Sequence, residues 1–349
     1  MNASTFDGAM GSRAPAVAPH PTHKLRLLLR REFWEHKGGF FWAPVVAGGI
    51  SLLLTLMALI VGEVVARRAM ADGKLNVDDK FTVNGLDLGV ITGRLSPDDM
   101  HQLGNGIDLS LFLSSSWPFM VLGFVVFFYC LGALYDDRKD RSVLFWKSLP
   151  VSDRDTVVSK ALSALVVAPV IATAAALATM IGFLAIISLF VLIHGGNPYT
   201  LVWGPGSPLG VIAHLIAAIP VYALWALPTV GWLMLCSAWA RSKPFLWAVM
   251  IPVFAAIFVA WFDIMNLFNL DATWFLQHVT GRALLSVFPG MWMTATDSIN
   301  VHGPEDFSTL MSLRQTYSVF ASPQLWIGAV AGIAMIIGAI RLRRWRDDN

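Results

Sequence analysis

The side chains that could perform chemistry are few and scattered along this chain of 349 residues. Tyr135-Asp136, Asp263, and the pair His302 and Asp306 are polar groups in or beside apolar stretches, where a membrane enzyme would hold its catalytic residues. Their spacing gives no paired acid and base, and no nucleophile with a neighbouring base. A polytopic membrane enzyme, such as an intramembrane protease or acyltransferase, is therefore kept only as an alternative.

Nucleotide and metal chemistry are not indicated either. The sequence has no GxxxxGK[ST] phosphate loop and no LSGGQ-like stretch. Cys130 and Cys236 lie inside apolar runs, without the neighbouring ligands that a metal site needs. His194 and His214 are isolated, and isolated histidines are weak indicators of function. We therefore expect no catalytic residue, no metal and no cofactor bound by this chain.

The composition indicates a membrane protein. Hydrophobic residues make up 56% of the chain and charged residues 14%, whereas a soluble domain carries roughly 25% charged residues. This excludes a disordered chain, a collagen-like chain and a nucleic-acid-binding domain. Six stretches free of Asp, Glu, Lys and Arg are near the length that crosses about 30 Å of hydrocarbon, and lipid requires them to be helices. The predicted spans are about 40–61, 111–134, 161–193, 211–235, 245–262 and 325–340.

Lysine and arginine set the expected orientation. If both termini are cytoplasmic, the inner segments hold 18 of these residues and the outer segments hold 7, as the positive-inside rule requires. The sequence thus predicts an all-α polytopic membrane protein with six transmembrane helices, preceded by an amphipathic interfacial helix. The expected units are a disordered cytoplasmic tail 1–22, an elbow helix 23–39, a transmembrane domain 40–340 and a basic cytoplasmic tail 341–349.

Two long extracytoplasmic loops, 62–110 and 263–324, complete this prediction. The second contains Phe288-Pro289-Gly290-Met291-Trp292, which is too apolar for a plain solvated loop. It is interpreted either as a short re-entrant or interfacial segment, or as part of a small subdomain with its own core.

The stretch HKLRLLLRREFWEHK, which opens the segment 23–39, predicts an interfacial helix. Apolar and charged side chains alternate along it, and Gly38-Gly39 is expected to break the chain before the first span. The helix is either a simple anchor or an elbow that also meets a cytoplasmic partner. Its candidate residues are Arg26, Arg30, Arg31, Phe33 and Trp34.

The inner segment 135–160, here called the coupling segment, carries a mixed-charge run followed by an apolar ridge. Pro150 ends any short helix in it, and Ser152 with Asp155 offers a capping box for the next helix. An apolar ridge in a charged loop is suited to docking against another protein, the alternative being that the ridge sinks into the lipid interface. The candidate docking residues are Asp137, Arg138, Asp140, Arg141, Val143, Leu144, Phe145, Trp146 and Lys147.

The coupling segment resembles the loop between the second and third spans of type-2 ABC transporter permeases. Those loops show an acidic and basic run, a short apolar helix, a Leu-Pro-Val-Ser-like turn and a lysine that opens the next span. The counterparts here are 137–141, 142–147, Leu149-Pro150-Val151-Ser152 and Lys160. The likeness extends to the elbow helix, the six spans and a Pro-containing outer segment before the last span, for which Phe288-Pro289 is the counterpart.

The resemblance implies the membrane subunit of an ATP-driven exporter in the bacterial plasma (inner) membrane. Two permease copies, or this chain and a related permease, would pair with two cytoplasmic ABC ATPase subunits, which bind the ATP and Mg. The coupling segment would dock in a groove on the ATPase and transmit its closure. The absence of charge from 161 to 240 agrees with this, because ion-coupled transporters place charged groups at mid-membrane.

An amphiphilic substrate, such as a lipid, peptide or drug, would cross between the two copies, in contact with membrane lipids and with no nucleic acid involved. Aromatic side chains of the second and fifth spans either line this path or pack the core. The candidates are Phe119, Phe124, Phe127, Phe128, Phe254 and Phe258. The other alternative is a non-transporting sensor or scaffold whose outer loops bind a ligand.

Overall fold

The computed structural model describes residues 21–72, 88, 96–139, 152–265, 271–295 and 312–347. Regular structure in these residues is helical throughout, and six helices are long and apolar enough to cross a membrane. The predicted all-α polytopic membrane fold is confirmed. The six spans are Gly38–Ala69, Pro97–Lys139, Asp153–Ile193, Pro208–Trp225, Pro244–Ile264 and Pro323–Trp345.

The spans are built from separate helical elements, several of which follow one another without a break. A π-helical turn, Gly38–Trp42, connects α1 to α2, and another, Ser163–Val167, connects α7 to α8. The main helices are α1 (Pro21–Glu35), α2 (Ala43–Ala71), α4 (Pro97–Gly132), α5 (Tyr135–Lys139), α7 (Asp153–Leu162), α8 (Ala168–Ile193), α9 (Pro208–Trp225), α10 (Leu227–Trp239), α11 (Pro244–Ile264) and α16 (Pro323–Asp347). The shorter α12 (Ala272–Phe275), α13 (Gly281–Leu284) and α15 (Leu313–Ser318) lie between α11 and α16.

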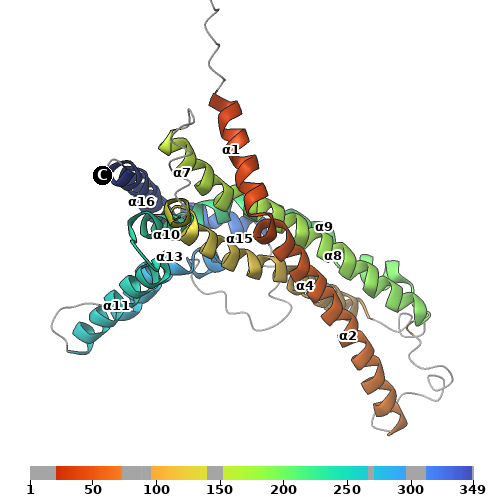
Figure 1. Cartoon of the computed structure of the whole chain (residues 1–349). Coiled ribbons are helices and arrows are strands. Elements are labelled where there is room, and N and C mark those ends of the chain that lie inside the picture. Colours follow the sequence, from red (N-terminus) through yellow and green to blue (C-terminus); the bar gives the residue numbers. More distant parts are fainter. Residues whose placement is uncertain are drawn as a thin grey trace, which may run out of the picture.

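Helix α4 is the centre of the bundle. It packs against α2 and α8 on one side and against α10 on the other, and α10 packs in turn against α16 (Figure 1). A large apolar core surrounds Val126 of α4 and Met234 of α10, and a second core joins α4, α8 and α9 around Met180. Helix α11 diverges from the others at one side of Figure 1, and α2 and α8 diverge at the other.

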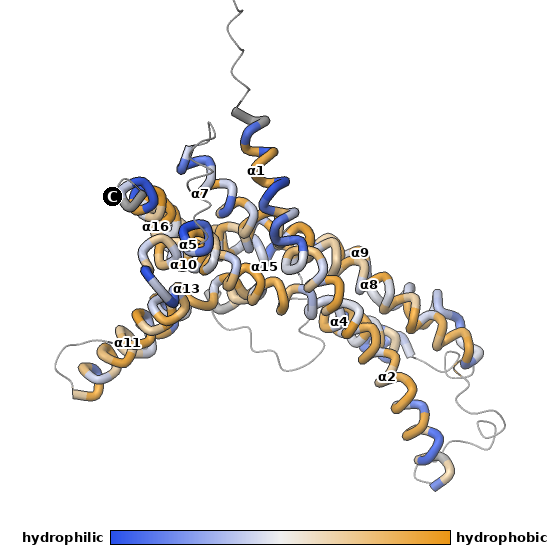
Figure 2. The backbone as a smooth tube through the Cα atoms, in the orientation of Figure 1, coloured by the Kyte–Doolittle hydropathy of each residue, from blue (hydrophilic) through white to orange (hydrophobic). Residues whose placement is uncertain are grey.

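Polar residues gather at one end of the bundle. Figure 2 shows hydrophilic stretches on α1, α5, α7 and the last turns of α16, and hydrophobic residues along most of the long helices, although α2 also becomes hydrophilic at its far end. We call this end the α1 end. Large apolar side chains face outward on the spans, including Leu53 (63% exposed) and Phe258 (62% exposed). Such a surface is expected where the surrounding solvent is lipid.

The predicted span 211–235 is not one continuous helix. Helix α9 ends at Trp225, and α10 begins at Leu227 with Pro228 in its first turn. Pro228 has no backbone N–H to donate to the carbonyl of Leu224 in the preceding turn. The neighbouring carbonyl of Trp225 accepts from Nη1 of Arg282 at 3.3 Å. The segment therefore consists of a span and a shorter apolar helix.

The predicted break at Gly38-Gly39 is also absent. Both glycines belong to the π-helical turn that continues α1 into α2, and Phe40 donates its backbone N–H to the carbonyl of His36 at 2.9 Å. Glycine weakens a helix by roughly 0.5–1 kcal/mol relative to alanine, which the burial of Phe40 offsets.

The predicted outer loops contain more helix than expected. Helix α2 continues to Ala71, and α4 begins at Pro97 after a capping box. In that box Asp99 donates its N–H to Oγ of Ser96 at 3.2 Å, and Ser96 donates its N–H to the Asp99 carboxylate at 3.0 Å. In the second loop, α12 and α13 pack against α11, and α13 also packs against α10.

Glycines allow α10 and α16 to approach closely. A Cβ on Gly231 would overlap the backbone carbonyl of Gly332, and a Cβ on Gly332 would overlap the carbonyl of Leu227. Backbone atoms cannot move aside as a flexible side chain can, so a methyl group here separates the two helices.

The Gly332→Ala variant is therefore expected to lower the free energy of unfolding by about 1–3 kcal/mol, the usual cost of overpacking. Gly49→Ala on α2 is the matched control, because no atom lies within 4 Å of its added Cβ. Unfolding of both variants in detergent micelles would be compared with that of the wild type. Equal stabilities of the two variants would show that close approach of α10 and α16 contributes nothing.

Candidate functional site

Five charged side chains form a network at the α1 end of the bundle. Glu32 comes from α1, Asp137 from α5, Asp153 and Lys160 from α7, and Arg343 from α16. Three of them are almost fully buried, with exposed fractions of 1% for Glu32, 2% for Lys160 and 6% for Arg343. Buried charges are costly unless they are paired, so these contacts must form together.

The network runs as a chain of alternating charge. Nζ of Lys160 lies 3.2 Å from Oε1 of Glu32 and 3.5 Å from Oδ1 of Asp137. The other oxygen of Asp137 accepts from Nη1 of Arg343 at 3.2 Å, and Nε of Arg343 donates to Asp153, also at 3.2 Å. Three carboxylates therefore share two cations.

Tyr129 of α4 forms a hydrogen bond with the carboxylate of Glu32. Its hydroxyl donates to Oε2 of Glu32 at 2.9 Å, and its ring packs edge-on against both His36 and Phe40. Helix α4 is thus tied to α1 by a hydrogen bond between two buried side chains as well as by packing.

The network holds both ends of the coupling segment. Asp137 lies near its start, and Asp153 and Lys160 lie near its end. Through these three side chains the segment is joined to α1 at Glu32 and to α16 at Arg343. A displacement of the segment would therefore strain buried ion pairs on both the first and the last helix.

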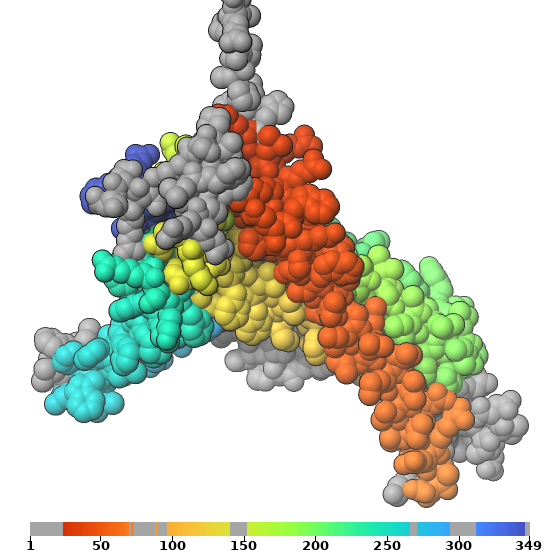
Figure 3. Space-filling view, viewed as in Figure 1, coloured from red at the N-terminus to blue at the C-terminus, as the bar shows by residue number. Residues whose placement is uncertain are grey.

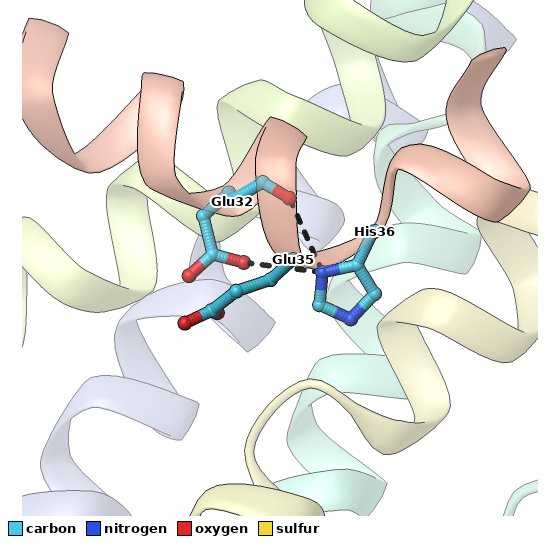
Figure 4. Close-up of side chains that lie close together, drawn as sticks. All are labelled: Glu32, Glu35 and His36. Atoms are coloured by element: carbon cyan, nitrogen blue, oxygen red, sulfur yellow. Dashed lines mark hydrogen bonds and ion pairs between the residues drawn. The ribbon is translucent and has the colours of Figure 1, made fainter.

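Glu32, Glu35 and His36 place three potential metal ligands within 4.8 Å of one another. Figure 4 shows that the His36 ring faces Glu32, with Nδ1 3.3 Å from the Glu32 carbonyl. Each carboxylate already has a cation, since Glu32 is paired with Lys160 and Glu35 with Nε of Arg31 at 2.7 Å. Glu32 therefore belongs to the ion network, whereas Glu35 is held by Arg31 on the same helix.

Arg138 joins α5 to the end of α10 through hydrogen bonds. Its guanidinium donates to the carbonyls of Ser237 and Ala240, the latter at 3.1 Å, where α10 leaves carbonyls without helical partners. In return, Oγ of Ser237 accepts from the backbone N–H groups of Leu134 and Tyr135, at 3.1 and 2.9 Å. The start of the coupling segment is thus attached to α10 as well as to α1 and α16.

The structure describes only part of the predicted docking set. Asp137 and Arg138 lie on α5, in the contacts given above. The others lie outside the described residues: Asp140, Arg141, Val143, Leu144, Phe145, Trp146 and Lys147.

Helix α1 turns one face toward the bundle. Leu28 and Glu32 are buried on the face toward the bundle, and Phe33 packs beside the large core. The other candidates lie further out: Arg26 and Arg30 are exposed, Trp34 is exposed, and Arg31 is half-buried and paired with Glu35.

Sequence reasoning missed the central members of the network. The sequence pattern does not single out Glu32, Tyr129, Asp153 or Arg343, and it indicates Lys160 only as the start of a span. One signal was available: Glu32 follows Leu28 by four residues, so it shares the apolar face of α1. An acidic residue on that face needs a buried partner.

The six candidate path aromatics do not form one wall. Phe119 lines a cavity of about 370 Å³ between α4, α8, α9 and residues 288–293, and Phe127 packs against the large core. Phe128 stacks on Phe245 of α11, with ring centres 6.3 Å apart. The remaining three are exposed on α4 and α11: Phe124, Phe254 and Phe258.

Helix α4 is recessed on one face of the molecule. Figure 3 shows its atoms between those of α2 and α11, which project further. Phe124 and Phe128 lie on this helix and are more than half exposed, at 51% and 57%. Of the predicted path aromatics of α4, these two are therefore accessible, whereas Phe119 and Phe127 are partly buried.

The residues considered for an enzyme have structural contacts or lie outside the described residues. A carboxylate oxygen of Asp263 accepts from the backbone N–H of Ala272 at 3.3 Å, and the N–H of Tyr135 donates to Ser237. A Cβ on Gly132 would overlap Oδ2 of Asp136. His302 and Asp306 lie outside the described residues.

Comparison with protein-family models, curated proteins and solved structures finds no match for this chain. Its own geometry identifies a multi-pass membrane protein in which buried ion pairs join both ends of one polar segment to the first and last helices.

Proposed function

We propose that this chain is the membrane-spanning permease subunit of an ATP-driven ABC exporter. The observation that carries the proposal is the attachment of the coupling segment to α1 and α16 through Glu32, Lys160 and Arg343. A segment held this way can pass an external force to the bundle. The segment resembles the coupling loops of type-2 ABC permeases, and this resemblance indicates that a separate ATPase subunit exerts the force.

The helices on either side of the segment suit such transmission. Helix α5 directly follows the long α4, and α7 continues through a π-helical turn into α8. Because α4 and α8 pack along each other, a push on the segment would move both as one unit. In this proposal two ATPase subunits bind ATP and Mg, and their closure provides the push.

The α1 end is the cytoplasmic end in this proposal. The hydrophilic stretches of α1, α5, α7 and α16 gathered there (Figure 2) include lysines and arginines of all four helices, as the positive-inside rule requires for the bacterial inner membrane. The recessed face of α4 would meet a second permease copy, and an amphiphilic substrate would pass along the aromatic residues between the copies.

Reconstitution with the partner tests the proposal. The chain in lipid nanodiscs would be mixed with the stand-alone ABC ATPase encoded beside it, and the ATPase rate would be compared with that of the ATPase alone. We expect a stable complex and a several-fold stimulation. If neither a complex nor stimulation appears, while an unrelated permease and its own ATPase respond under the same conditions, the proposal is wrong.

A further inference from the structure

A second cavity lies away from the ion network. It has a volume of about 540 Å³ and lies between α10, α11, residues 274–283 and the first half of α16. This volume falls within the range of about 300–1,000 Å³ that is common for ligand pockets. Apolar side chains form most of its wall, among them Trp232, Ile251, Phe275, Ile327 and Met335.

The polar side chains of the cavity gather in one corner. Arg282 donates to the backbone carbonyl of Gln324 at 3.4 Å, and the side chain of Gln324 lies 2.9 Å from Nε2 of His278. The guanidinium of Arg282 also stacks 3.5 Å from the centre of the Trp225 ring, and it donates to the Trp225 carbonyl and to Ser286. These contacts fix its position.

The charge of Arg282 is not neutralised by the residues that the structure describes. Its hydrogen-bond partners are two carbonyls and a hydroxyl, and among the described residues no carboxylate forms an ion pair with it. A cation beside apolar walls is unfavourable without a counter-ion. A guanidinium pairs best with phosphate or carboxylate oxygens, so the corner fits an anionic group.

The rest of the cavity fits a hydrocarbon chain. Along α16 its lining runs from Gln324 in the polar corner through Gly328 and Ala331 to Met335. The Arg282 guanidinium lies beside Gly328, and the seven residues of helix from there to Met335 rise about 10 Å, so apolar lining extends for roughly that distance from the charge. Gly328 keeps the corner open, because a Cβ there would overlap the Arg282 guanidinium.

We propose that this cavity binds an anionic membrane phospholipid, with the phosphate headgroup at Arg282 and one acyl chain along α16 toward Met335. The inference comes from the cavity and its charge alone, and it stands whether or not the chain is a transporter subunit. It concerns the end of α16 opposite the ion network.

Native mass spectrometry of the full chain in detergent tests this site. Dioleoyl phosphatidylglycerol and dioleoyl phosphatidylcholine have the same chains and differ in net headgroup charge. We expect phosphatidylglycerol to bind at least tenfold more tightly. Arg282→Gln should reduce its affinity to that of phosphatidylcholine, and Arg282→Lys should retain part of it. Arg314→Gln removes the same charge from exposed α15 and should change nothing.

A second variant tests the acyl-chain part of the site. Ala331→Phe places a ring in the apolar part of the cavity and should weaken the binding of both lipids without abolishing the preference for phosphatidylglycerol. If Arg282→Gln fails to fold, Arg282→Lys and Ala331→Phe decide the question. Equal binding of the two lipids by the wild type, unchanged binding by folded Arg282 variants, or displacement of the lipid by millimolar inorganic phosphate would each overturn the proposal.

Discussion

Replacing Lys160 with methionine is expected to lower the free energy of unfolding by about 3–5 kcal/mol, the usual cost of removing one partner of a buried ion pair. Methionine fills much of the same space but leaves the carboxylates of Glu32 and Asp137 without their shared cation. Glu32 is 1% exposed and cannot recover solvation by turning to water. The measurement is the unfolding free energy of the purified chain in detergent micelles.

Two controls separate this effect from a general loss of charge. Lys139→Met makes the same substitution at an exposed position of α5 and should change stability by less than about 0.5 kcal/mol. Glu32→Gln combined with Lys160→Met removes both charges of the pair and should be more stable than Lys160→Met alone. If the double variant loses the sum of the two single effects, Glu32 and Lys160 are not coupled and the network has been misread.

Replacing Leu144 and Trp146 with alanine is expected to abolish stimulation of the partner ATPase while the permease remains folded. Truncating a buried aromatic anchor of an interface costs about 2 kcal/mol or more, equivalent to a loss of affinity of roughly thirtyfold. Both residues lie outside the described residues, so this prediction rests on the sequence pattern. The stimulated ATPase rate and the dissociation constant of the complex would be measured.

The matched control replaces Trp203 and Leu209 with alanine. Both side chains are exposed, at 48% and 78%, where α8 connects to α9 at the end opposite the ion network. This variant should stimulate the ATPase as the wild type does. Full stimulation by the Leu144 and Trp146 variant would show that the apolar ridge is not the docking element.

The sequence was sufficient to predict the helical spans because lipid imposes a simple rule. A stretch without charge and of sufficient length must satisfy its own backbone groups as a helix, and six such stretches became the six spans. The break at Trp225 was not predicted. Pro118 and Pro220 lie inside continuous helices, so proline alone does not specify a break.

A distant contact accompanies this break. The carbonyl of Trp225 accepts from Arg282, which lies 57 positions further along the chain. The ion network shows the same limit, since Glu32 and Lys160 are 128 positions apart. Local patterns predict helices and their capping residues, such as Ser152 of α7, but they do not specify which distant side chains meet.

Cross-linking from position 146 tests the central claim most directly. Cys130 and Cys236 are both buried; after their replacement by alanine, Trp146→Cys carries a benzophenone label as the only cysteine. Irradiation with the partner ATPase should give a permease–ATPase product, and Leu209→Cys at the opposite end should give none. If both chains purify together but position 146 gives no product, or if Leu209→Cys gives as much, the coupling segment does not contact the ATPase.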